Sequence, residues 1–338
     1  METFGNALRR LRVQTGLKPG ELANWRQSQI SRTDIGRDTI DQLNVITEQL
    51  CCEYGSRPAD ELRQDAHHQL TYVQQLLQGP TRLAEHRELL VIAGWLALLI
   101  GCLNYDLGLA RHAETARTAA FQLGREAGHG EIVAWSFEMS AWFALTQGRL
   151  RLIPNYVDAG VQAAPHASVA VQLAAQAAKA HARMGNHSGV RRALDQGARL
   201  LSDHEHPSRP ENHFVIDPAK WDCYAMDCYR IAGDDARASA NAWEILRLSA
   251  RPDGIDRSPM RASEARLTLS IVSLRDGDID GATEWARQAF ATDRRSVNSL
   301  SIVTGELYHE ARAHFGDDPA INALNDVIAS FYASVSHR

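Results

Sequence analysis

The sequence predicts an all-α protein in which a short basic head precedes a long body of repeated helix pairs. Apolar residues recur at helical spacing along the chain, and no stretch alternates between apolar and polar residues as a β-strand does. Alanine is frequent, and glycine and proline stand mainly between the apolar segments, which is typical of helices and their ends. With 44% hydrophobic and 23% charged residues, the composition excludes a wholly disordered chain.

Charge is unevenly spread over the 338 residues. Residues 1–37 hold seven basic and three acidic side chains, so this head carries +4 while the rest of the chain carries −9. A basic head on an acidic body is typical of a protein that contacts nucleic acid at the head, although a piece this short can also be basic by chance or for solubility. We divide the chain into a head (1–37), two connecting helices (38–79) and a repeat body (80–338).

Five glycines mark the body at intervals of 37 to 48 residues, and we expect each to end the first helix of a pair: Gly108, Gly148, Gly185, Gly233 and Gly277. The hinge between antiparallel helices needs a residue that tolerates left-handed backbone, and closely packed helices need small side chains. Mostly small residues stand seven before, five after and twelve after the glycines: Gly101, Ala141, Ala178, Met226 and Ser270; Ala113, Ile153, Val190, Ala238 and Ala282; Ala120, Gly160, Gly197, Ile245 and Ala289.

This pattern resembles the tetratricopeptide repeat, which has a small residue in its first helix, a glycine at the turn and alanines in its second helix. The stretches "RLTLSIVSLRDGDIDGATEWARQAFA" and "LIGCLNYDLGLARHAETARTAAFQLG" carry the resemblance, which covers residues 94–315. The repeats are longer than that family's period, and Ile153, Met226 and Ile245 depart from its small residues. A generic helical solenoid is therefore the alternative.

The resemblance implies a superhelix whose first helices line a groove. In the tetratricopeptide register, the inward positions lie thirteen, ten, six and three residues before each turn glycine. A concave wall with apolar anchors and a few polar groups is typical of a site for a small molecule or a peptide. The predicted ligand-binding residues are Trp95, Tyr105, Trp135, Glu138, Trp142, Gln172, Lys179, Lys220, Asp227, Arg230 and Glu264.

The longest break in the repeats, "SDHEHPSRPENHFVIDPAKW" from Ser202, contains His204, His206 and His213 among carboxylates. Because two of these histidines are two residues apart with no second pair at a fixed spacing, we favour a solvated loop over a metal site and predict no metal ion or other cofactor. Asp217 and the proline after it indicate the cap and first turn of a helix. The break lies beside the predicted groove, where it can act as a lid.

In the head, "FGNALRRLRVQTGLKPGELA" strongly resembles the first two helices of the XRE-type helix-turn-helix, and "SQISRTDIGRD" resembles the end of its recognition helix. About three residues of the family pattern are missing between them, roughly 4.5 Å of helix. The missing residues belong to the turn or to the start of the recognition helix, which reads bases in the major groove. The head is therefore expected to be a partial helix-turn-helix, with DNA contacts from Arg9, Arg12, Lys18, Gln27, Ser28, Gln29, Arg32 and Arg37.

An XRE head on a tetratricopeptide body resembles a group of bacterial regulators abundant in actinobacteria. The resemblance implies a cytoplasmic transcription regulator that senses a ligand or peptide in its groove and binds DNA through its head. We expect a homodimer, because symmetric DNA sites are usually met by symmetric proteins. The alternative is a tetratricopeptide scaffold protein that has lost sequence-specific DNA binding. An enzyme is not expected, because we find no phosphate loop, nucleophile signature or metal pair.

Five scattered cysteines, and an N-terminus without an apolar signal segment, favour a reducing cytoplasm. We interpret Cys223 and Cys228 as small core residues rather than a disulfide or a metal pair. The longest apolar run, "LLVIAGWLALLIGCLNY" from Leu89, is marginal in length for a membrane span. We therefore predict a buried helix there and no membrane partner.

Overall fold

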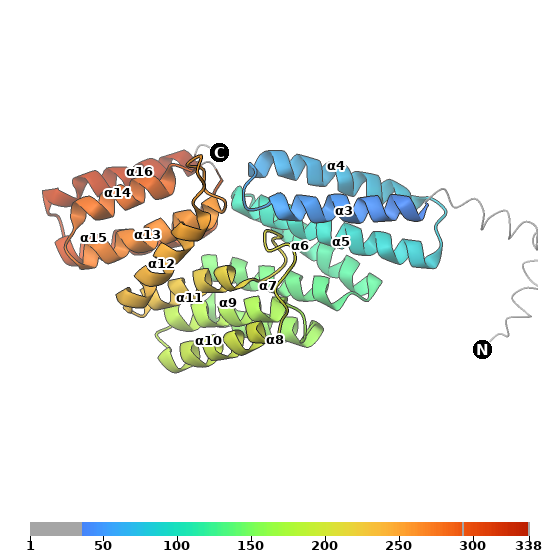
Figure 1. The fold of residues 1–338 in the computed structure, drawn as a ribbon, viewed down its shortest axis with the longest axis horizontal. Helices are drawn as coiled ribbons and strands as arrows, with labels where there is room; N and C mark the ends of the chain where they lie inside the picture. Colours follow the sequence, from blue (N-terminus) through green and yellow to red (C-terminus); the bar gives the residue numbers. More distant parts are fainter. Residues whose placement is uncertain (1–35, 293, 337–338) are drawn as a thin grey trace, which may run out of the picture.

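The computed structural model describes residues 36–292 and 294–336, and these residues form 14 α-helices without a β-strand (Figure 1). The prediction of an all-helical protein is confirmed. The helices are α3 (Arg37–Glu53), α4 (Ala59–Gln78), α5 (Leu83–Asp106), α6 (Ala110–Ala127), α7 (Gly130–Thr146), α8 (Ile153–Ala163), α9 (Val169–Arg183), α10 (His187–Ser202), α11 (Pro218–Ile231), α12 (Asp235–Ser249), α13 (Pro259–Arg275), α14 (Ile279–Phe290), α15 (Val297–Phe315) and α16 (Asn322–Ser336). Short 3-10 turns precede α8 and α16.

From α5 onward the helices pack in consecutive pairs, α5 with α6 through α15 with α16. The five predicted turn glycines follow the first helix of the first five pairs and have φ between 69° and 82°, as a left-handed hinge requires. The fifteen residues predicted to lie between paired helices are all buried. At Gly197 of α10 the reason is direct, since a Cβ atom there would lie 2.1 Å from the ring of Trp221.

The connecting helices α3 and α4 share one apolar core with the first part of the body. Ile40 of α3, Leu62 of α4 and Leu96 of α5 belong to this core and are fully shielded from solvent. Among the described residues, α5 alone is long and apolar enough to cross a membrane, but most of it is buried inside the protein. The prediction of a buried helix in the run from Leu89 is confirmed.

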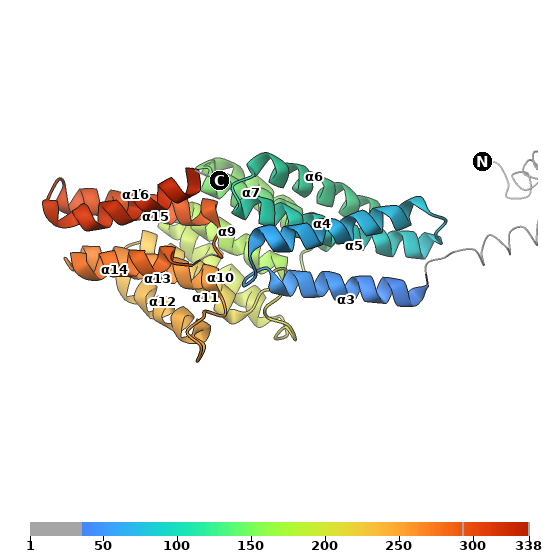
Figure 2. The same cartoon turned by 90° about the horizontal axis from the view of Figure 1, so that it is seen from above.

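The first helices of the pairs form a closed ring. In order, α5, α7, α9, α11, α13 and α15 each contact the next, and α15 returns to contact α5 and α7. We call these six helices the inner ring. Figures 1 and 2 show the body curving from α5 and α6 through α9 and α10 to α13–α16, with the C-terminal helices returning beside the end of α5. The sequence predicted an open groove, and the ring instead encloses a hollow.

Arg294, just before α15, makes the contact that closes the ring. Its side chain is buried and donates from Nε to the carbonyl of Tyr54 at 2.8 Å and from Nη2 to Oδ2 of Asp106 at 2.9 Å. The guanidinium also lies over the Tyr54 ring, 4.6 Å from its centroid. Beside it, Asn298 Nδ2 donates to the carbonyl of Tyr105 at 2.7 Å. One charged side chain therefore joins the end of α5, the α3–α4 turn and the start of α15.

Replacing Arg294 by alanine should lower the free energy of unfolding by about 3–5 kcal/mol, because the Asp106 carboxylate would remain buried without its cation. Urea denaturation followed by circular dichroism measures this loss. Arg247→Ala is the matched control, since its pair with Glu244 is exposed to solvent and should contribute little to stability. Equal effects of the two substitutions would show that the Arg294 contact does not hold the ring closed.

Candidate functional site: the enclosed hollow

The inner ring surrounds a hollow of about 830 Å³. Its walls come from α7, α9, α11, α13 and α15, and it is completed by α12 with the loop after it, by the α3–α4 turn and by the segment between α10 and α11. Hollows of this size accommodate small molecules. Six of the eleven predicted ligand-binding residues line it: Glu138, Trp142, Gln172, Lys179, Lys220 and Glu264.

Three predicted aromatic ligand contacts lie in the protein core instead. Trp135 has no exposed surface and packs edge-on against Phe214, with ring centroids 5.2 Å apart. Trp95 packs against the same phenylalanine at 5.3 Å. Tyr105 stacks on Phe143 at 3.9 Å, because its position in the last turn of α5 faces the neighbouring helix α7. The sequence register did not separate positions that face the hollow from positions that face the next helix.

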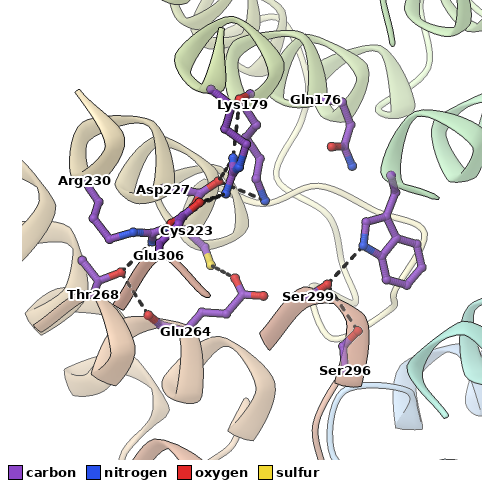
Figure 3. A network of polar contacts seen from close by, with 12 residues as sticks. Gln176, Lys179, Cys223, Asp227, Arg230, Glu264, Thr268, Ser296, Ser299 and Glu306 are labelled. Carbon is purple, nitrogen blue, oxygen red and sulfur yellow. Dashed lines mark hydrogen bonds and ion pairs between the residues drawn. The ribbon is translucent and has the colours of Figure 1, made fainter. Parts of the chain in front are cut away.

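The two other predicted residues outside the lining, Asp227 and Arg230, belong to a buried ion-pair network (Figure 3). Asp227 pairs with Arg183 at 2.8 Å, with Lys179 at 3.5 Å and with Arg230. Glu306 of α15 pairs with Arg183 at 2.9 Å and with Arg230 at 2.6 Å. Burial lowers the Lys179 pKa, but the charges of Asp227 and Glu264 together outweigh burial, so the pKa is raised. The network joins α9, α11 and α15 along one edge of the hollow.

Glu138 lies deep in the wall of the hollow and is 3% exposed. Its Oε1 accepts hydrogen bonds from Nε2 of Gln172 at 2.9 Å and of Gln176 at 2.7 Å. Burial raises the Glu138 pKa, although the two amide hydrogen bonds act in the opposite direction. Glu264 on α13 is half-buried, and burial raises its pKa too; its Oε2 accepts a weak thiol hydrogen bond from Cys223 at 3.7 Å.

The second half of the segment between α10 and α11 enters the interior, so the prediction of a solvated loop is wrong for residues 213–217. The backbone N–H of His213 donates to the carbonyl of Cys51 at 3.1 Å, and its ring lies 3.7 Å from that of Tyr54. Phe214 is buried between two tryptophans. Apolar side chains at alternate positions, Phe214 and Ile216, anchor the segment. Among the described residues, no group of three or more His, Cys, Asp or Glu side chains is placed to hold a metal ion.

Lys220 holds this segment from the first turn of α11. Its Nζ donates to the carbonyls of His213 at 2.5 Å and Val215 at 3.1 Å, and lies 5.6 Å from the centroid of the Trp135 ring. Burial, assisted by the charge of Arg261, lowers the Lys220 pKa to about 7. The predicted cap of this helix is confirmed, since an Asp217 oxygen accepts from the Lys220 backbone N–H at 2.8 Å.

Sequence reasoning missed several residues that line the hollow. Gln176 and Tyr224 lie four positions after Gln172 and Lys220, on the same helix faces. Helical periodicity would therefore have been enough to predict them. Ser299 of α15, whose Oγ accepts from Trp142 Nε1 at 3.1 Å, had no such signal, because only ring closure brings α15 to α7.

Of the eight predicted DNA contacts, only Arg37 lies within the described residues. It begins α3, where Nη1 donates to the Glu88 carboxylate at 2.8 Å and Nε pairs with Asp41 at 3.0 Å. All five cysteines are buried free thiols, and Cys223 and Cys228 are core residues as predicted.

No protein-family model matches this chain, and no curated protein shows significant similarity to it.

The lowered Lys220 pKa makes stability depend on pH. Between pH 7 and 10.5 the unfolded lysine holds a proton that the folded one has released, so its contribution to stability increases as pH rises and is lost as pH falls toward 7. The difference in unfolding free energy between the wild type and Lys220→Met should increase by about 2–3 kcal/mol from pH 7.5 to 9.5. Denaturant titrations at both pH values measure this difference.

Lys179→Met is the control for this experiment, because the Lys179 pKa is raised and its charge does not change over the same range. The wild type should differ from Lys179→Met by the same free energy at both pH values. A pH-independent difference for Lys220→Met as well would mean that Lys220 stays charged in the folded protein.

Proposed function

We propose that this protein is a ligand-responsive transcription regulator that binds a small molecule in the enclosed hollow and DNA through its basic head. The observation that carries the proposal is the hollow itself, where polar and charged side chains face a space of about 830 Å³ inside the ring of helices. Polar groups buried without a full set of partners are costly, so their concentration around one hollow favours a ligand site over a packing defect. The tetratricopeptide resemblance of the helix pairs supports the same interpretation.

Helix α3 offers a physical link between ligand and head. It follows the head directly in sequence, and its first residue, Arg37, is held to α5 by Glu88. At its other end, Cys52 and Tyr54 line the hollow. Seventeen residues of helix span roughly 25 Å, so a ligand that moves the α3–α4 turn also moves the point where the head is attached. A ligand regulates DNA binding in this way if it favours one position of α3 over another.

The proposed DNA contact rests on the seven predicted residues that precede Arg37, since two carboxylates already occupy the Arg37 guanidinium. Their positive charge suits phosphate, and the polar side chains from Gln27 to Arg32 suit base edges. We propose a homodimer that brings two heads to a symmetric site.

The second candidate is a binding protein that does not read DNA. The specific observation in its favour is the shortened head, which lacks about three residues of the XRE pattern where bases are read. In this alternative the hollow still binds its ligand, and the response passes to a protein partner.

Fluorescence anisotropy of a labelled duplex from the region upstream of the protein's own gene tests DNA binding. The full-length protein should bind, and its affinity should fall steeply as salt rises from 50 to 200 mM, because phosphate contacts release counterions. Arg32→Ala should weaken binding by about tenfold, in line with roughly 1–3 kcal/mol for a base contact. The control Arg287→Ala, an exposed arginine paired with Glu284 on α14, should bind as the wild type does. Absence of binding at 50 mM salt would exclude the regulator and favour the second candidate.

A further inference from the structure

Glu138 differs from every other deeply buried acid in the described part of the chain. Three aspartates are buried to a similar degree, and each has an arginine within ion-pair distance: Asp106 with Arg294, Asp217 with Arg261, and Asp227 with Arg183 and Arg230. Glu138 has two glutamine amides and, among the described residues, no basic side chain within 4 Å. A carboxylate buried without a cation is unfavourable.

The cations around the hollow are engaged elsewhere. The Lys220 ammonium donates to two backbone carbonyls, and the Lys179 ammonium pairs with Asp227. Arg261 lies 3.9 Å from the Asp217 carboxylate. The charges of Lys220 and Lys179 act on Glu138 from a distance, but neither side chain can form a direct ion pair with it without breaking an existing contact.

The two glutamines beside Glu138 add unsatisfied acceptors. Because each amide nitrogen donates to Glu138, each amide oxygen faces away from it, and neither Oε1 has a hydrogen-bond donor among the described residues. Gln172 is 5% and Gln176 4% exposed, and both line the hollow. The Glu138 Oε2 atom also has no hydrogen bond to a described residue. Because both glutamine oxygens are themselves shielded from solvent, the Glu138 Oε2 atom is the acceptor that remains for a ligand in the hollow.

We propose that the hollow binds a small organic cation whose protonated primary amine pairs with Glu138, which Gln172 and Gln176 hold in position. An alkylammonium group has N–H donors and one positive charge, which match the free Oε2 atom and the charge of this carboxylate. The inference rests on the proposed function only in that the hollow is a ligand site, and it assigns the ligand a chemical class.

Other lining residues fit the rest of such a ligand. Trp142, one turn after Glu138 on α7, lines the hollow and offers an aromatic ring to an alkylammonium. The Glu264 carboxylate lies on α13, and within residues 36–292 and 294–336 its side-chain hydrogen bond comes from the Cys223 thiol alone (Figure 3). In Figure 3, Gln176, Glu264 and Ser299 come from three different helices and point toward the same central space. A second amine at the far end of a diamine would face Glu264.

Isothermal titration calorimetry of the full-length protein tests the proposal with two probes of equal length and opposite charge, 1,5-diaminopentane and glutarate. The diamine should bind with one site per chain and glutarate should not. Glu138→Gln keeps a carbonyl oxygen for both glutamine amides but removes the charge, and should weaken diamine binding at least tenfold. Glu114→Gln, an exposed glutamate paired with Arg117 on α6, is the control and should bind as the wild type does.

A second variant keeps the test decisive if Glu138→Gln does not fold by circular dichroism. Gln176→Met removes one of the two amides that hold the Glu138 carboxylate, at similar side-chain length, and should also weaken diamine binding. Glutarate binding in place of the diamine, no diamine binding, or unchanged affinity in the folded variants would overturn the proposal. Because calorimetry needs no DNA, a DNA response to an acidic ligand would leave the proposed function standing while this inference fails. Diamine binding without any DNA binding would support this inference and contradict the proposed function.

Discussion

The buried contact of Arg294 with Asp106 and Tyr54 is the constraint on which the enclosed hollow depends. Helix pairs that stack only on their neighbours leave a curved array open along one side. Here the C-terminal pairs return to the beginning of the body, and one arginine satisfies a carboxylate and a backbone carbonyl that are both shielded from solvent. Breaking the contact would leave a buried charge unpaired, so the closed arrangement is strongly favoured once it has formed.

Ring closure also decides which side chains face the hollow. It brings Ser299 against Trp142 and places Glu306 between two arginines of α9 and α11. The segment between α10 and α11 fills the remaining gap, where Phe214 packs on Trp135 and Lys220 holds the backbone on each side of it. As a result, aromatic side chains that would line an open groove pack against the core, and many of the side chains that line the hollow are polar or charged.

The electrostatics of the hollow follow from this enclosure. The lysines and Arg261 on its walls are engaged with carboxylates or carbonyl groups, whereas Glu138 has only amide partners among the described residues. In a low-dielectric site an unpaired carboxylate attracts a cation strongly, and a preformed set of acceptors needs little reorganisation to bind it. In the proposed regulator, the α3–α4 turn and helix α3 would connect this site to the head.

The sequence by itself determined that the chain is helical, where the glycine turns between paired helices lie, and part of the faces of α7 and α9 that point inward. Turn glycines such as Gly148 and caps such as Asp217 act through backbone within a few residues, and helical periodicity places Glu138 and Gln172 on one side of neighbouring helices. Only the tertiary structure decided that the array closes, because Arg294 finds partners 188 and 240 residues away and no repeat period encodes such a contact. For the same reason the burial of Trp135 and the unpaired state of Glu138 were not readable from local pattern, since both depend on which distant side chains fill the surrounding space.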